Sequence, residues 1–356
     1  MEKESEYSRV SRWVYIVGGM VLFVGFGYGA VIVKQFQRAA LAIPESHPQS
    51  NRPSQVHNHR KVRVARNTWR LHKLSRQLAN ETLPPMYQRL KPLHRLKRPP
   101  RSGDWLASFP ETGQTFGAYK LSSPNRPHGL RKTIVLQPIG SFSKDQRRLL
   151  QRVATYMSAY FCLPVIIQKV WSKNKIPRRY RRKGPEGTLQ LHTRYILQRL
   201  LTPNLPKRAV AYLALSSEDL WPGKGWNFVY GEAMLMQRVG VWSLYRFGSL
   251  GVSKAGDKRV LRRTLKVATH ETGHMFSMHH CIAYECNMNG SNHLVEMDNT
   301  PLPLGPVCLA KLQWSNGCNL RDRFRSLLKL SKRWGLVKES RFFAKSLKTL
   351  TQFSKK

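Results

Sequence analysis

The chain has 356 residues, among them 61 lysines and arginines but only 19 aspartates and glutamates, which gives a formal net charge of +42. Hydrophobic residues make up 41%, enough for a folded core, and an odd count of five cysteines in a chain this long excludes a disulfide framework. The charge says nothing about the fold, but it predicts attraction to polyanions such as RNA, DNA, anionic lipid or an acidic protein. A general basic bias with solvated side chains is the alternative interpretation.

An uncharged run follows the polar N-terminal segment 1–12. Residues 13–33 have the sequence WVYIVGGMVLFVGFGYGAVIV and are bracketed by Arg12 and Lys34. As a helix this run would span about 30 Å, the thickness of a bilayer core. We therefore expect one transmembrane helix that anchors the chain to a membrane. A cleaved signal or transit segment, with AALA at 39–42 as the processing site, is the alternative.

Residues 34–131 are basic and interrupted by prolines, and their apolar residues are too sparse to predict a core. A short basic helix over 66–80 is compatible with the pattern. The composition favours a linker or an arm that binds polyanions such as RNA or anionic lipid.

Periodic structure begins at Lys132. Apolar β-branched runs predict strands, and helical spacing of apolar residues predicts helices between them. This alternation predicts an α/β domain over 132–319, with the last helix packed below the sheet. The expected strands are 133–138, 165–167, 209–215, 226–230 and 240–245, the expected helices are 145–160, 189–201 and 258–276, and 173–184 is an expected loop.

The tail 320–356 is basic and amphipathic. It is interpreted as helix packed on the domain, with a helix that docks on lipid or RNA as the alternative.

The last predicted helix carries the sequence HETGH at 270–274, with a further histidine at His280. On a helix, His270 and His274 lie one turn apart on the same face, where two neutral imidazoles can bind one Zn²⁺. His280 lies beyond the helix and can complete a three-histidine site with an open fourth position. Glu271 is placed to take a proton from a zinc-bound water. The alternative is a chance motif on a solvated helix face.

Four of the five cysteines fall within or just after this stretch, which favours thiolate metal ligands over disulfide bridges. The cysteines are Cys162, Cys281, Cys286, Cys308 and Cys318.

The segment HETGHMFSMHHC, followed by IAYEC, NM and GSNHL, resembles the archaemetzincins, zinc proteases with the pattern HExxHxxGxxHC, then C-x-M, then C-x-x-C. Other segments, such as TIVLQPIGSF and DLWPGKGWNFVYGEA, resemble the family in the expected order. The resemblance covers about 132–320.

This resemblance implies a metzincin-like zincin with a twisted mixed sheet, an active-site helix and a cleft along the sheet edge. His270, His274 and His280 would bind the catalytic zinc, and Glu271 would be the general base and later the proton donor to the leaving amine. Met288 would lie under the zinc site. The family's second, structural zinc is bound by four thiolates, and the matching residues here are Cys281, Cys286 and Cys308.

Two positions depart from the family pattern. Ser277 replaces the glycine that ends the helix, and a serine in the left-handed conformation costs roughly 1 kcal/mol. Gly305 replaces a cysteine of the C-x-x-C, so the second zinc lacks a ligand. The candidates for a fourth donor are Cys318, His279, Asp298 and water. Three buried thiols without metal are the alternative.

The sequence predicts a membrane-anchored zinc metalloprotease that hydrolyses peptide bonds in a peptide or protein substrate. A mitochondrial or other organellar inner membrane fits the basic body of the chain. The rival is a non-catalytic scaffold on an inherited protease fold, binding RNA or an organellar complex through its basic arm and tail. His293 is expected either to line the cleft or to be an ordinary loop residue.

Overall fold

The computed structural model describes residues 13–17, 20–24, 70–234 and 236–353. A five-stranded sheet forms its centre, with the strand order β4-β3-β7-β10-β9. Neighbouring strands are parallel except at the edge, where β9 runs antiparallel to β10. The strands are β3 (Thr133–Ile139), β4 (Val165–Ile167), β7 (Ala209–Ser216), β9 (Gly231–Met234) and β10 (Val239–Ser243).

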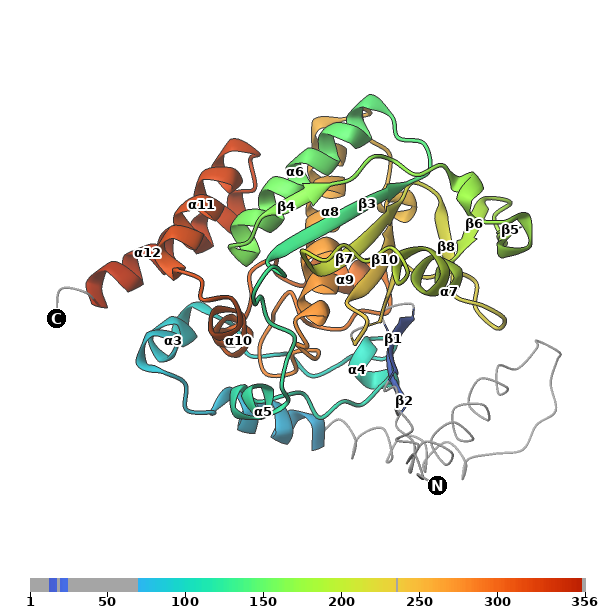
Figure 1. Cartoon of the computed structure of the whole chain (residues 1–356). Coiled ribbons are helices and arrows are strands. Elements are labelled where there is room, and N and C mark those ends of the chain that lie inside the picture. The colour runs from blue at the N-terminus through green and yellow to red at the C-terminus, as the bar shows by residue number, and fades with distance from the viewer. Residues whose placement is uncertain (1–12, 18–19, 25–69, 235, 354–356) are drawn as a thin grey trace, which may run out of the picture.

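The strands β3, β7 and β10 are buried along their whole length because both faces of the sheet are covered. The helices α6 (Lys144–Phe161) and α8 (Lys254–Met275) pack against one face (Figure 1). A short helix α7 (Thr193–Tyr195) continues as a π-helix, Ile196–Leu201. The apolar residues of this π-helix pack on the other face of the sheet.

A smaller sheet has the strand order β5-β6-β8 and lies beside α7. Its strands are β5 (Arg181–Lys183), β6 (Leu189–His192) and β8 (Asp219–Trp221). The predicted helix 189–201 is therefore wrong over its first four residues. The Gln190 side chain donates to the Asp219 carboxylate within this sheet, which accounts for a buried polar residue in a strand. The predicted strand 226–230 is also displaced, since the edge strand β9 begins at Gly231.

Residues 70–131 belong to the folded domain, and the linker interpretation is wrong for them. A helix over 70–79 is followed by α3 (Pro85–Leu90), η1 (Lys91–Leu93), α4 (Trp105–Ser108) and α5 (Phe116–Leu121). Their few apolar residues are concentrated on the inward faces of these short helices, so a low apolar content still suffices for burial. The buried residues include Leu78, Tyr87, Leu90, Trp105 and Tyr119. Residues 34–69 of the predicted arm lie outside the described residues.

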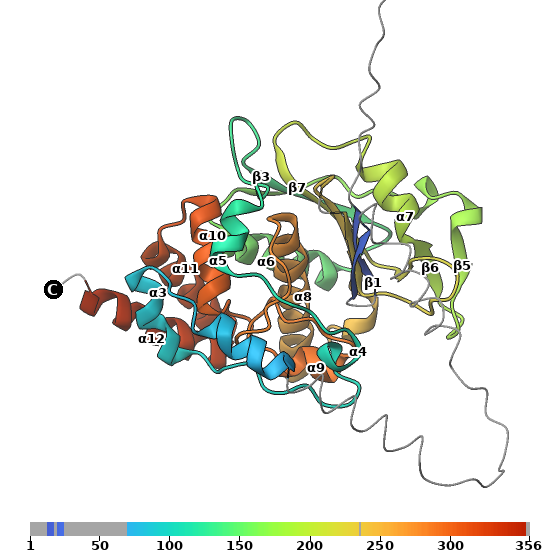
Figure 2. The same ribbon diagram turned by 90° about the horizontal axis from the view of Figure 1, so that it is seen from below.

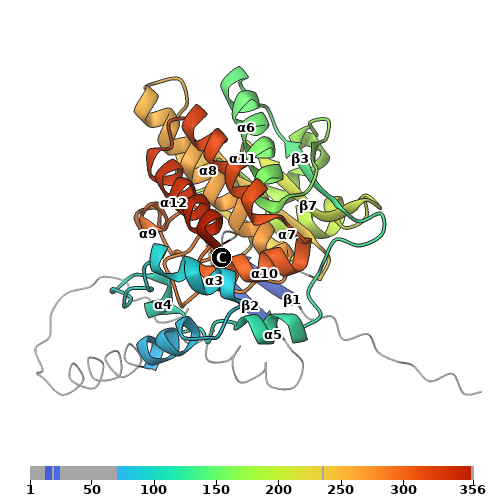
Figure 3. The same ribbon diagram turned by 90° about the vertical axis from the view of Figure 1, so that its left-hand side faces the viewer.

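The C-terminal segment forms α10 (Pro306–Asn316), α11 (Leu320–Arg333) and α12 (Val337–Phe353). Figure 3 shows α11 and α12 beside α6 and α8, while α3 and α5 lie near α10. Phe324, Leu327 and Phe343 are buried against the main core, so this tail packs on the domain. The Arg262 guanidinium of α8 also pairs with Glu339 of α12 at 2.9 Å.

Of the predicted transmembrane helix over 13–33, residues 18–19 and 25–33 lie outside the described residues, and the described part is not helical. The structure describes two strands, β1 (Trp13–Val17) and β2 (Met20–Val24), which pair antiparallel, with β1 beside β9 (Figure 2). Both strands are rich in the β-branched and aromatic residues that favour strands. Within the described ranges, no helix is both long and apolar enough to cross a membrane.

Leu90→Ala tests whether α3 is part of the folded domain. Leu90 is fully buried, so we expect the free energy of unfolding to fall by about 2–5 kcal/mol in urea titrations. The matched control is Leu121→Ala, because Leu121 is 87% exposed and its loss should cost less than about 0.5 kcal/mol. Equal effects of the two substitutions would contradict the packing of α3.

Glu232 of β9 is fully buried, and one of its carboxylate oxygens accepts a hydrogen bond from the Thr193 hydroxyl. Burial raises its pKa from 4.5 to about 7. The folded protein therefore binds the Glu232 proton more tightly than the unfolded chain does. The resulting contribution to the free energy of unfolding is fully present below pH 4.5 and is lost as the pH rises through about 7. Glutamine does not titrate, so the free energy of unfolding of Glu232→Gln, relative to that of the wild type, should rise by about 2–3 kcal/mol from pH 5 to pH 8. Parallel stability curves for the two proteins would contradict the raised pKa.

Candidate metal centre

The helix α8 positions two of the three predicted histidine ligands. Its N-terminus is capped by the Ser253 hydroxyl, and it ends at Met275, just after the HETGH sequence. Ser277 then adopts a φ of +63°, the left-handed conformation expected of the residue that replaces glycine. This turn sends the chain back along the helix, so that His280 returns to His270 and His274.

The three histidines meet through their Nε2 atoms. One ligand atom from each of His270, His274 and His280 lies within 4.8 Å of the others. His270 Nε2 and His274 Nε2 are 3.0 Å apart, and His280 Nε2 is buried with no hydrogen-bond partner among the described residues. Burial lowers the pKa of His270 to about 3, and burial with the neighbouring histidines also lowers the pKa of His274. The rings of His270 and His274 are therefore neutral, as metal binding requires.

Each of the opposite ring nitrogens contacts an acceptor. His270 Nδ1 lies 2.7 Å from the Asn287 carbonyl, and His274 Nδ1 lies 2.7 Å from the Met278 carbonyl. The protons therefore reside on Nδ1, and the Nε2 lone pairs point at one another, an arrangement that a bound cation stabilises. The residues present fit Zn²⁺ by donor type, by convergence and by tautomer.

Glu111 binds the third histidine, and sequence reasoning missed it. Its Oε1 atom lies 2.9 Å from His280 Nδ1 and also accepts a hydrogen bond from Trp105 Nε1 at 2.9 Å. Glu111 lies 169 residues before His280 in the segment assigned to the basic arm, so no local spacing could indicate it. A carboxylate on the far side of a ligand histidine fixes its ring and raises its basicity.

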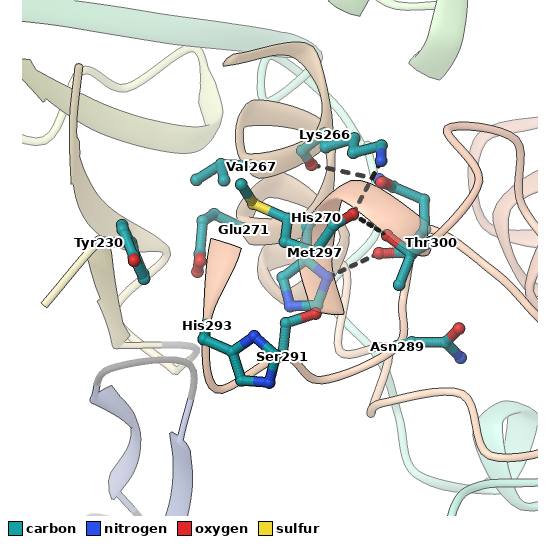
Figure 4. A pocket seen from close by; sticks show the side chains of 11 residues that line it. Tyr230, Lys266, Val267, His270, Glu271, Asn289, Ser291, His293, Met297 and Thr300 are labelled. Carbon is teal, nitrogen blue, oxygen red and sulfur yellow. Dashed lines mark hydrogen bonds between the residues drawn. The ribbon is translucent and has the colours of Figure 1, made fainter. Parts of the chain in front are cut away.

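Glu271 lies beside the histidines in a pocket that is also lined by Tyr230 and His293. Its side chain is largely buried, its Oε2 has no partner among the described residues, and burial raises its pKa to about 8. Gly231, at the start of β9, leaves room for this carboxylate, since a Cβ there would lie 3.2 Å from Glu271 Oε1. Figure 4 shows Tyr230 on the facing side of the pocket, with Ser291 and His293 at another edge.

Met288 lies directly under α8. A Cβ on Gly273 would come within 2.5 Å of Met288 Sδ, so the thioether packs against the helix between the two histidine positions. The Met288 carbonyl also accepts the Cys281 amide at 2.7 Å, which ties the segment after His280 to this residue.

Cys281, Cys286 and Cys308 form a second, fully separate cluster, with sulfur atoms within 4.8 Å of one another. The Gly305 amide, at the position of the missing cysteine, donates to Cys286 Sγ at 3.1 Å. Among the described residues, no fourth donor joins the three sulfurs within that distance.

The proposed fourth donors have other partners. Cys318 is disulfide-bonded to Cys162, which corrects the expectation that it serves as a metal ligand. Asp298 pairs with Arg263 at 2.6 Å. His279 has contacts elsewhere and is not part of the thiol cluster.

Glu111→Ala should weaken zinc binding, because it removes the acceptor that orients His280. We expect the zinc affinity, measured by competition with a chelator, to fall by about 10–100-fold. Glu111→Gln keeps an acceptor oxygen and should lose less. Glu186→Ala is the matched control, since this glutamate side chain is 61% exposed and pairs with Arg246, away from the histidines. An unchanged affinity in Glu111→Ala would refute the orienting role.

A family model described as Peptidase family M54 matches residues 207–314, which include the HETGH helix. Archaemetzincin-2 of Mus musculus is 32% identical over 257 residues, covering 64% of this chain and 71% of that protein. Archaemetzincin-1 of Homo sapiens is 30% identical over 260 residues, which cover 63% of this chain and 51% of that protein. The crystal structure of archaemetzincin from Methanopyrus kandleri shares 26% identity over 53% of this chain and 97% of that one, with a TM-score of 0.43. On the sequence relationship, the chain belongs to the archaemetzincins, a family of zinc metallopeptidases.

Proposed function

We propose that this protein hydrolyses peptide bonds with zinc bound by His270, His274 and His280. One observation carries the proposal: three histidines direct their Nε2 atoms to one point beside the buried carboxylate of Glu271. Zinc, when bound there, supplies a Lewis acid that polarises a carbonyl and acidifies water. The other tasks fall to residues of this chain.

Glu271 is the proton carrier of the proposed reaction. Its carboxylate takes one proton from the attacking water, whose oxygen forms the new bond to the carbonyl carbon. The same proton then passes to the amine nitrogen as the carbon–nitrogen bond breaks. Its position suits this role, because Glu271 directly follows the ligand His270 and lines the same pocket.

The surroundings of Glu271 favour an enzyme over the scaffold alternative. The carboxylate is buried with one oxygen unpartnered among the described residues, a state that costs free energy and contributes nothing to holding RNA or another protein. The carboxylate of Glu111 likewise serves the orientation of His280. The net charge of +42 supports an additional affinity for polyanions, which does not compete with peptide hydrolysis.

Glu271→Gln should abolish hydrolysis and leave zinc bound. The amide is nearly isosteric but cannot accept the proton, so we expect the rate on a casein-derived peptide mixture, followed by mass spectrometry, to fall at least about 100-fold. Zinc per chain should match the wild type. His274→Ala is the complementary variant and should lose both zinc and activity. A Glu271→Gln protein that keeps full activity would show that another group carries the proton.

A further inference from the structure

His293 is a pocket residue that the reaction described above does not use. It is the N-cap residue of α9 (Leu294–Asn299), and its Nδ1 atom accepts a hydrogen bond from the Glu296 amide at 3.2 Å. A ring nitrogen that accepts a hydrogen bond carries no proton. The cap therefore places the proton of the neutral His293 ring on Nε2, opposite to the tautomer of the three histidines of the metal centre.

The Nε2–H group of His293 is available to a ligand. The Asp104 Oδ1 atom lies 3.9 Å from the His293 Nε2 atom, which is beyond hydrogen-bond distance, and no hydrogen bond within the described part of the chain uses this donor. The side chain is 47% exposed and lines the same pocket as His270 and Glu271 (Figure 4). The cap holds the ring from the other side, so the donor has a fixed direction at the edge of the pocket.

Most other donors that line the pocket are already bonded. Lys266 Nζ donates to the Met297 and Asp298 carbonyls. The Asn287 amide donates to the Lys266 carbonyl and to Thr269, and the Thr300 hydroxyl donates to the Met297 carbonyl. The hydroxyls of Tyr230, on the facing wall, and of Ser291, beside His293, remain. Tyr230 is the principal competitor for a catalytic role.

We propose that His293 is a further catalytic residue, whose neutral Nε2–H donates a hydrogen bond to the substrate carbonyl oxygen as that oxygen gains negative charge. No bond to His293 forms or breaks, and its proton stays on Nε2. The inference rests on the proposed peptidase function and adds to it the group that stabilises the developing oxyanion. Donors fixed before the reaction in this way contribute more than mobile ones, because they need no reorganisation.

A cation site is the competing use of this residue, since Asp104, His293 and Glu296 place donor atoms within 4.8 Å of one another. Backbone amides already bond to three of the four carboxylate oxygens of this cluster. The Glu296 oxygens accept the Trp105 and Asn292 amides, and one Asp104 oxygen accepts the Arg101 amide. With the cap on His293 Nδ1, the backbone therefore satisfies most of this cluster without a metal.

His293→Asn separates the catalytic role from the cap. Asparagine is a strong N-cap residue, so the variant keeps the hydrogen bond that begins α9. Its shorter side chain places no N–H group where the His293 Nε2 atom lies. We expect kcat on the casein-derived peptides to fall by about 100-fold with KM changed less than about 3-fold. Tyr230→Phe is the matched variant and should stay within about 5-fold of the wild type. Wild-type kinetics in His293→Asn, or the large loss in Tyr230→Phe instead, would overturn the proposal.

Two further measurements keep the outcome interpretable. Nitrogen-15 spectra of histidine-labelled Glu271→Gln protein should show His293 protonated at Nε2, and protonation at Nδ1 would overturn the proposal whatever the kinetics show. Metal content per chain should be the same in His293→Asn and the wild type, whereas loss of one ion would assign the residue to a cation site. A wild-type protein that binds zinc but is inactive would refute the proposed function. An active wild type together with wild-type activity in His293→Asn would refute only the role of His293.

Discussion

The contacts at the Nδ1 atoms of the three histidines are the constraint on which the centre depends. An imidazole can direct a lone pair at a metal only if its proton resides on the other nitrogen, and an acceptor must hold it there. The acceptors here are the Met278 carbonyl just after α8, the Asn287 carbonyl further on, and the Glu111 carboxylate from the segment before the sheet. Placing these three acceptors around one helix end requires most of the domain to be folded.

Burying the residues of the metal centre destabilises the folded state, and packing in the rest of the fold must offset this cost. Histidines and a carboxylate are buried with unpartnered atoms, and burial alone disfavours their charged forms. Two apolar layers surround them, one between the sheet and α6 and α8, the other between the sheet and the 193–201 segment. The bound cation would return part of this cost by satisfying the three Nε2 atoms, so metal binding and folding stability are coupled.

The sequence predicted the local features and missed those that depend on distant segments. The spacing of His270 and His274 is a property of one helix turn, and the runs at 133–138 and 209–215 are buried strands in any α/β sheet. Glu111 could not be predicted, because its role depends on a contact across 169 residues. The 70–131 segment was assigned to an arm for a related reason: composition counts apolar residues, whereas burial depends on whether those few residues share a face.

The same segment compensates for the departure from the family pattern at Ser277. The Asn125 amide donates to the Ser277 hydroxyl at 3.1 Å, a bond that glycine could not accept, and the Gln114 side chain donates to the Ser277 carbonyl. Tyr119 adds a bond to the carbonyl of Phe276. Hydrogen bonds of this kind contribute about 1 kcal/mol each, which matches the cost of a left-handed serine.

At Gly305 no side chain takes the place of the cysteine that the family pattern has there. The Gly305 backbone amide instead donates a hydrogen bond to Cys286 Sγ, and an amide N–H cannot bind a metal ion as a thiolate does. The two departures therefore differ in consequence. The turn that carries His280 to the metal centre is held by contacts from the 70–131 segment, whereas the thiol cluster has three sulfurs and no fourth donor among the described residues. None of the three histidines takes its Nδ1 acceptor from a cysteine, so zinc in the thiol cluster would not act on the metal centre through these contacts.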